Sequence, residues 1–524
     1  MSDRNDRQSE ILFRAITDLP DERVEEAMPP VRAPARRPAW KAPAALAACL
    51  VLILGFNAFR LGFFGHTGGA AGRGGEASGQ VYMSYAGPVF PLSALGAPDL
   101  TAVRCVDFDF SPYAPHEETD PDENGRPGSF TAWRNQAVVT DSYTLTNPEE
   151  NVQTVTLLYP FAASLSDGPD RIPAVTVDGQ AADTVLHIGP TAEGYKDLFA
   201  DDPDAADQPW NLIDLSAWTS YRTLIGAGYQ DRAMEPAPVP DLPVTVYRLT
   251  DCAPPEGYQG EFFDLAVVSR PGARVLTWGF NFGFRDEMTG QEGRGCGIAA
   301  DGANRSVPTL IVLDGGLEDC TVRAFAGGTG RETPLEGAKW SLGREETTLS
   351  AVLNAIAAEN LKESRQYGEK DNILSTLSPA GYTDLAERNL SDLGVLTGDP
   401  AQLYGGGMLE ELFTANTAAD RVLYLSFEVT LPARGTAEVT ASMIKPASFD
   451  FTGKDKNRNG YDLVTRLGSP LAFTAQTATI SNPDWVEIIA QNFGFDPEAG
   501  VTSVTLDPGQ EHYYLDVVRR TAPR

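Results

Sequence analysis

Histidine is scarce in this chain of 524 residues, which contains only His66, His116, His187 and His512. Sites that use histidine for acid–base chemistry or metal binding therefore have little material. Residues 116–119 begin like the zinc motif H-E-x-x-H but lack its second histidine, and the sequence has no P-loop, G-x-G-x-x-G loop or G-x-S-x-G elbow. We predict no catalytic residues and no cofactor, although paired carboxylates leave hydrolase chemistry open.

Cysteine is also rare, and its spacing argues against a zinc site. Of the five cysteines, Cys49 lies in an apolar run, and none of the other four has C-x-x-C spacing. Four cysteines allow three pairings, and one or two disulfides are favoured over free thiols if these residues are exported. The disulfide candidates are Cys105, Cys252, Cys296 and Cys320.

Basic residues are outnumbered, with 41 Lys and Arg against 72 Asp and Glu and a net charge of −31. Basic and acidic side chains are equal in number over residues 1–41, so the excess of acid lies beyond residue 41. Nucleic acid is therefore not an expected partner, because its recognition requires a basic surface. We interpret the acidity mainly as an aid to solubility.

One apolar run, residues 42–64, follows a basic patch at Arg32, Arg36, Arg37 and Lys41. A membrane-spanning helix needs about 20 apolar residues, so the run predicts a transmembrane helix with Arg60 near one interface. A cleaved signal peptide is the alternative, but its basic region would be unusually long. The basic flank predicts a cytoplasmic N-terminus, a single-pass cell-membrane protein and extracellular C-terminal domains.

The predicted cytoplasmic tail, residues 1–41, contains short amphipathic helices. Leu12, Ala15, Ile16 and Leu19 recur at helical spacing, and a second helix begins near Asp18. Two such amphipathic helices could bind either a cytosolic partner protein or the membrane surface. Residues 11–27, read together with the apolar run, resemble the membrane-anchored anti-sigma-like proteins of Gram-positive bacteria. That resemblance implies a sigma factor as the partner of residues 9–28.

Beyond a Gly-rich linker at residues 65–80, the pattern indicates β structure, which 50 glycines and 38 prolines also favour. Period-2 alternation predicts a hairpin from strands at 138–146 and 152–160, and a similar one at 422–431 and 437–444. We interpret the two hairpins as equivalent elements of two immunoglobulin-like β-sandwich domains, residues 81–253 and 259–524. Each carries a helical insertion, at residues 211–229 in the first domain and about 348–413 in the second.

Residues 120–125 resemble a calcium-binding loop, with candidate oxygen ligands at Asp120, Asp122 and Asn124 and a glycine at the sixth position. The twelfth position is Thr131 rather than a bidentate acid, so a polar turn is the favoured interpretation. The sequence as a whole predicts a non-enzymatic sensing or binding protein of the cell envelope, with anti-sigma-like signalling through its tail. A tethered hydrolase that uses carboxylates and a structural or adhesive surface protein are the alternatives.

Overall fold

The computed structural model describes residues 84–523 except residues 97, 122–126, 190–217, 227–232, 235–241, 270–273, 286–291, 303–305, 314–316, 318–320, 328–332, 368–371, 393–407, 411–416, 418–419, 450–456 and 467. The described residues belong to one compact unit, Gly75–Arg524, and are mainly β with several sheets. The predicted tail, span and linker (residues 1–41, 42–64 and 65–80) lie outside the described residues.

The predicted localisation requires a correction. None of the helices that the structure describes is long and apolar enough to cross a membrane. The run at residues 42–64, on which the prediction of a single-pass membrane protein rested, lies outside those residues. The structure therefore does not support the predicted localisation.

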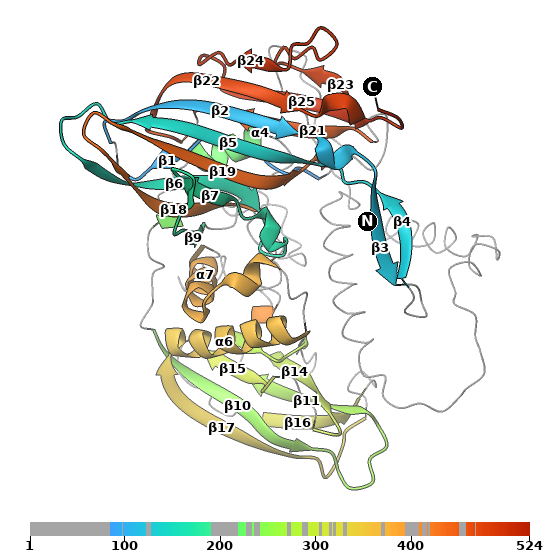
Figure 1. Ribbon diagram of the computed structural model, residues 1–524. Coiled ribbons are helices and arrows are strands. Elements are labelled where there is room, and N and C mark those ends of the chain that lie inside the picture. Colours follow the sequence, from blue (N-terminus) through green and yellow to red (C-terminus); the bar gives the residue numbers. More distant parts are fainter. Residues whose placement is uncertain are drawn as a thin grey trace, which may run out of the picture. The chain divides into compact units, whose positions relative to one another are not determined.

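Two sheets contain strands from both ends of the described chain (Figure 1). One has seven strands in the order β24-β22-β2-β5-β19-β7-β8, and the other has four in the order β1-β6-β18-β9. All neighbours are antiparallel except β2 and β22, which run parallel. The bounds are β1 Ser93–Ala94, β2 Thr101–Asp109, β5 Gln136–Thr146, β6 Gln153–Ala163, β7 Ala174–Val177, β8 Gln180–Ala181, β9 Val185–Ile188, β18 Arg421–Leu431, β19 Thr436–Pro446, β22 Ala472–Ser481 and β24 Ser503–Thr505.

The four long strands predicted from the alternating pattern are confirmed as β5, β6, β18 and β19, but their predicted pairing is wrong. β5 pairs with β19 and β6 pairs with β18, along all 11 residues of each strand. Each supposed hairpin instead passes from one sheet into the other, and the two hairpins are halves of the same pair of sheets. Strand pairing therefore crosses the boundary predicted between residues 253 and 259.

The inward faces of these two sheets share one hydrophobic core. Alternate residues of β5 are buried along its length, as expected for a strand with one face on a core. Leu145, Leu157, Leu425 and Val439, all predicted to face cores, are buried in this common core. The turns at the ends of the two hairpins also bind each other, because the Asn147 side chain donates to the carbonyls of Asn151 and Pro432.

A smaller sheet has the order β20-β21-β25-β23, with β20 Ser448–Phe449, β21 Asn459–Val464, β25 His512–Arg519 and β23 Val486–Gln491. Tyr461, Leu463, Leu515 and Val517 of this sheet join the same core. A separate two-stranded hairpin contains β3 (His116–Pro121) and β4 (Pro127–Ala132).

A second pair of sheets is inserted in the sequence between β9 and β18. Its four-stranded sheets have the orders β12-β15-β10-β17 and β13-β14-β11-β16, and all their neighbours are antiparallel. Residues of both sheets pack in a core of their own. The bounds are β10 Pro243–Ala253, β11 Phe262–Ser269, β12 Val275–Trp278, β13 Phe282–Arg285, β14 Glu292–Ala299, β15 Thr309–Val312, β16 Thr321–Ala326 and β17 Lys339–Thr348.

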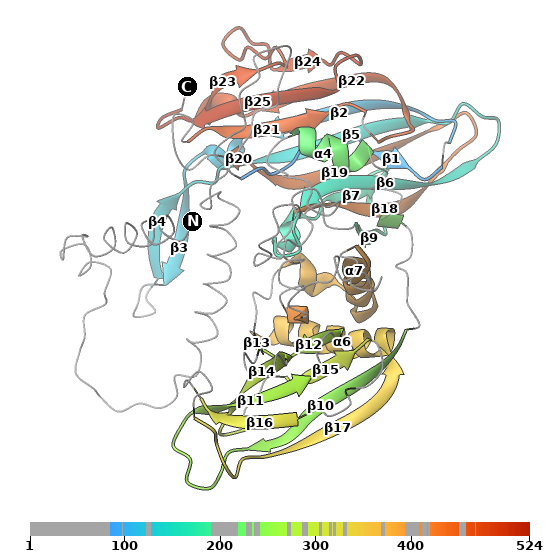
Figure 2. The ribbon, with the colours of Figure 1, turned by 180° about the vertical axis from the view of Figure 1, so that it is seen from behind.

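The predicted helical insertions contain α4 (Trp218–Gly226), α6 (Leu349–Tyr367) and α7 (Pro379–Asp392). The buried stripe of α6, at Leu349, Val352, Leu353 and Ile356, packs with inserted-sheet residues such as Val244 and Val246. Figure 2 shows α4 from behind; its buried residues pack on the outward side chains of β6 and β18. The described structure also has 3₁₀ turns at η1 Ser111–Tyr113, η2 Pro169–Arg171, η4 Ile373–Thr376 and η7 Pro483–Trp485.

Candidate functional site

A densely hydrogen-bonded buried site holds segment 84–94, the first described part of the chain. Apart from β1, this segment forms only isolated bridges, Ser84 with Phe449 and Val89 with Leu463. Tyr85, Val89, Phe90 and Leu92 are nevertheless buried. A buried segment outside a sheet must find other partners for its backbone groups. Charged and hydroxyl side chains from distant strands provide several of them.

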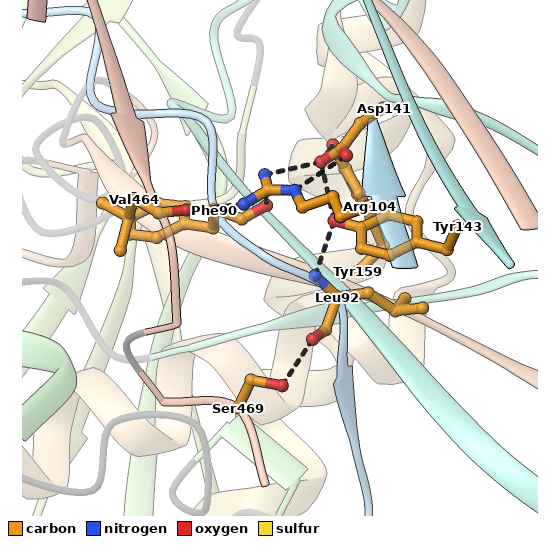
Figure 3. Close-up of polar contacts among 8 residues, drawn as sticks. All are labelled: Phe90, Leu92, Arg104, Asp141, Tyr143, Tyr159, Val464 and Ser469. Atoms are coloured by element: carbon orange, nitrogen blue, oxygen red, sulfur yellow. Dashed lines mark hydrogen bonds and ion pairs between the residues drawn. The ribbon is translucent and has the colours of Figure 1, made fainter. Parts of the chain in front are cut away.

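The centre of the site is a buried ion pair between Arg104 of β2 and Asp141 of β5 (Figure 3). Arg104 Nε donates to Asp141 Oδ1 at 2.9 Å, and Nη2 donates to Oδ2 at 2.8 Å. Both side chains are 0% exposed. This two-point contact matches the planar guanidinium to the carboxylate and fixes the orientation of both groups.

The same guanidinium also binds main-chain carbonyls that belong to no common strand. Arg104 Nη1 donates to the carbonyl of Val464 in β21 at 2.6 Å, and Nη2 donates to the carbonyl of Phe90 at 3.1 Å. One side chain thus connects the seven-stranded sheet, the smaller sheet and segment 84–94. Loss of the guanidinium would leave Asp141 and two carbonyls without these buried partners, and this would lower the stability of the fold.

Two tyrosines complete the coordination of Asp141. The hydroxyls of Tyr143 and Tyr159 donate to Asp141 Oδ2 at 2.7 and 3.2 Å. The Leu92 amide in turn donates to the Tyr143 hydroxyl at 2.8 Å, and the Leu92 carbonyl accepts from Ser469 Oγ at 2.6 Å. Both backbone groups of Leu92 are therefore held by side chains (Figure 3).

The electrostatics of this network keep its charges fixed. Burial by itself would lower the pKa of Arg104, but the charge and hydrogen bonds of Asp141 outweigh it and hold that pKa above its ordinary value. Burial raises the pKa values of Tyr143 and Tyr159 well above 10, and the Asp141 charge adds to this effect. The guanidinium therefore stays charged and both phenols stay neutral at any ordinary pH.

A second buried cation, Lys445 of β19, holds the start of the segment. Its Nζ donates to the carbonyl of Ala86 at 2.6 Å, and the Ala86 amide donates to Ser448 Oγ at 2.9 Å. Lys445 lies at an inward position of β19, after Ala437, Val439, Ala441 and Met443. Burial lowers its pKa from 10.5 to about 7, with Arg171 adding to the decrease.

Asp462 of β21 binds the segment from another side. The Tyr85 hydroxyl donates to its carboxylate, and the Val89 amide donates to its main-chain carbonyl at 2.8 Å. His512 Nε2 lies 3.5 Å from Asp462 Oδ1, and its ring stacks on Trp218 of α4 with centroids 5.1 Å apart. The segment itself fits closely: a Cβ on Gly87, whose φ is +71°, would lie 2.4 Å from the Cβ of Ala162.

The residues proposed from sequence as sites lie elsewhere. Asp120 is at the end of β3, where it pairs with Gly128, whereas Asp122 and Asn124 are outside the described residues. In the part of the chain that the structure describes, no group of three or more His, Cys, Asp or Glu could hold a metal ion. Cys105, Cys252 and Cys296 are free thiols, and Cys320 is not among the described residues.

The sequence analysis missed the residues of this site, although a signal was present. Arg104 interrupts the inward row Ala102, Val106 and Phe108 of β2, and Lys445 ends the inward row of β19. A charge on the apolar face of an alternating strand indicates a buried polar contact. The identity of its partners was not readable, because the contacts join residues separated by up to several hundred positions.

Comparisons of the chain with protein-family models, with curated proteins and with solved structures found no match.

Proposed function

We propose that this is a non-enzymatic sensing or binding protein whose β structure transmits its state to the N-terminal residues through segment 84–94. The observation that carries the proposal is that residues from distant parts of the chain all hydrogen-bond to the backbone of that one segment. These residues are Arg104, Lys445, Asp462, Tyr143 and Ser469. In sequence, the segment follows residues 1–83, and the predicted partner-binding helices occupy residues 9–28 of that region.

Coupling between distant parts of a protein requires a contiguous physical network with more than one arrangement. The site supplies the network, because the groups that bind segment 84–94 lie on β2, β5, β19, β21 and the loop that contains Ser469. Arg104, Lys445 and Ser469 donate to the segment, whereas Tyr143 and Asp462 accept from its amides. Any binding event that shifts one of these elements changes the geometry of the segment's hydrogen bonds. In the proposed mechanism, this change alters how firmly the segment is held.

The immunoglobulin-like description was predicted for residues 81–253 and 259–524; we now propose it instead for the inserted pair of sheets, residues 243–348. Two four-stranded antiparallel sheets that share a core have the architecture of many binding modules. We propose that this insertion contacts the ligand, since its strands form sheets only with one another in the described structure, apart from an isolated bridge between Thr277 and Met408. The strands of the first pair of sheets are left uninterrupted.

A hydrolase that uses carboxylates is the competing function. The two most buried carboxylates of the site, Asp141 and Asp462, accept hydrogen bonds from Tyr143 and Tyr85 and hold structural elements together. That arrangement suits a structural support better than a proton donor or nucleophile, which needs contact with a substrate. The predicted partner of the tail, a sigma factor bound by residues 9–28, remains a prediction.

The proposal is tested by combining two changes in the full chain in its host cells. Ser469→Ala removes one hydrogen bond to Leu92 with little change in volume, and deletion of residues 9–28 removes the predicted partner-binding helices. We expect Ser469→Ala to change the transcript profile of the host, and the deletion to abolish that change. Thr474→Ala, which removes a comparable bond to the Ala102 carbonyl outside the segment, is the matched control.

Two outcomes would contradict the proposal. A Ser469→Ala effect that persists after the deletion would show that the signal does not pass through residues 9–28. A full chain whose activity towards a substrate is lost in Asp141→Asn or Asp462→Asn, with unchanged folding, would support the hydrolase instead. Protein levels, measured by immunoblot, separate both outcomes from simple degradation.

A further inference from the structure

Two free cysteines lie on facing sheets of the inserted pair. Cys252 is near the end of β10, and Cys296 is in β14, opposite Leu265 of β11. Cys296 is fully buried in the core between the sheets, and Cys252 is partly buried and packs against that same core. The two residues belong to inner strands, since β10 lies between β15 and β17 and β14 lies between β13 and β11.

An irregularity in β10 turns Cys252 towards the core that contains Cys296. Tyr247 and Leu249 point into the core between the inserted sheets, so strict alternation would direct residue 251 inwards and residue 252 outwards. The register with β17 shifts between Thr250 and Ala253, and Asp251 has a φ of +52°. One extra residue in a strand reverses the facing of the residues after it. Cys252, rather than Asp251, therefore packs on the core.

One electrostatic observation is consistent with this placement. Burial raises the pKa of the Cys296 thiol, and the charge of a Cys252 thiolate would add to that increase. In the reduced state the thiols have separate acceptors: Cys252 Sγ donates to the Thr250 carbonyl at 3.6 Å, and Cys296 Sγ donates to the Leu265 carbonyl at 3.7 Å. These are weak bonds that either thiol can give up.

We propose that Cys252 and Cys296 form a disulfide that joins the two inserted sheets when a small-molecule disulfide, such as oxidised glutathione, is the oxidant. Of the three pairings open to the four cysteines, this assigns the one that contains Cys252–Cys296. It does not depend on the proposed sensing function.

The reaction proceeds in two exchange steps. The more accessible Cys252 loses its proton, and its thiolate attacks one sulfur of oxidised glutathione, forming a mixed disulfide and releasing one glutathione thiolate. The Cys296 thiolate then attacks the Cys252 sulfur and displaces the second glutathione thiolate. The two protein thiols are oxidised by two electrons, the oxidant is reduced to two glutathione molecules, and these take up the two protons. Because burial raises both thiol pKa values, the reaction should be slow at neutral pH and faster at pH 8.5.

The first experiment identifies the bond in the folded full chain. The reduced protein is incubated with oxidised glutathione at pH 8.5, its remaining thiols are blocked with N-ethylmaleimide, and tryptic peptides are analysed by mass spectrometry. Trypsin places Cys252 and Cys296 in different peptides, the latter spanning residues 295–305. We expect these peptides linked to each other. A dominant link from Cys252 to Cys320, or stable glutathione adducts on Cys252 with Cys296 still alkylatable, would overturn the proposal.

The second experiment separates the pair from the other cysteines. Oxidation should raise the melting temperature of the full chain by several degrees, and Cys252→Ser should abolish this shift. Cys105→Ser is the matched control, because Cys105 is exposed in β2 and belongs to a different sheet. The shift should persist in that variant. Cys296→Ala, which introduces no polar group into the core, should also lose the shift and the linked peptide. An undiminished shift in either pair variant would contradict the assignment.

Discussion

Replacement of Arg104 by Met tests the central feature of the site, the buried ion pair that holds segment 84–94. Methionine retains much of the aliphatic volume but removes the guanidinium, which contacts Asp141 at 2.9 and 2.8 Å and the carbonyls of Val464 and Phe90. Asp141 then keeps only the two tyrosine hydroxyls as the partners described for its side chain.

The expected loss is large because both side chains are fully buried. Removal of one partner of a buried ion pair costs about 3–5 kcal/mol, chiefly because a charge remains without compensation. The two carbonyls that lose a donor add to this cost. The matched control is Arg344→Met in β17, whose pair with Glu346 is exposed and should contribute at most about 1 kcal/mol.

The assay is urea denaturation of the full chain at neutral pH, monitored by tryptophan fluorescence, with hydrogen exchange at residues 84–94 as a local readout. A loss of stability below about 1 kcal/mol, equal to that of Arg344→Met, would refute the argument that the Arg104–Asp141 pair is both buried and required. If Arg104→Met does not fold, Tyr159→Phe removes a single donor and should still destabilise the chain by about 1–2 kcal/mol.

Three further substitutions test other parts of the structure. The free energy of unfolding of Lys445→Met, relative to that of the wild type, should be most favourable at pH 6 and should fall by about 4 kcal/mol between pH 6 and pH 10. The reason is that the Lys445 pKa is about 7 in the folded chain instead of 10.5, so between these pH values the folded wild type binds fewer protons than the unfolded chain and gains stability as the pH rises. A difference in urea stability between variant and wild type that is independent of pH would exclude a buried amine. Leu425→Ala should lower the free energy of unfolding by about 2–5 kcal/mol and make both residues 81–253 and residues 259–524 sensitive to protease, because Leu425 pairs with Tyr159 in one common core. Continued protection of residues 81–253 would indicate that the two halves are independent. Asn147→Ala should lower the melting temperature more than Thr154→Ala, because Asn147 joins the turns of both long hairpins, whereas Thr154 makes an exposed bond to Thr430; equal shifts would show that the turns do not need this contact.

The sequence alone determined where along the chain the strands and helices lie, because the pattern that specifies each element lies within a few neighbouring residues. The period-2 alternation of β5 and the apolar stripe of α6 are properties of single segments, and both elements form where those patterns predict. The Asp178-Gly179 turn between β7 and β8 also agrees with its sequence, since both residues take the positive φ values that such a turn requires.

Tertiary structure alone decided the partners of those elements. The β5–β6 and β18–β19 connections look like closed hairpins, and nothing within either one indicates that its strands enter different sheets and pair with the other hairpin. Likewise, the sequence marks Arg104 and Lys445 only as charges on apolar strand faces. Their partners at Phe90, Val464 and Ala86 are set by the packing of segments far apart in the chain, where burial makes each unpaired polar group costly and so selects the arrangement that satisfies them.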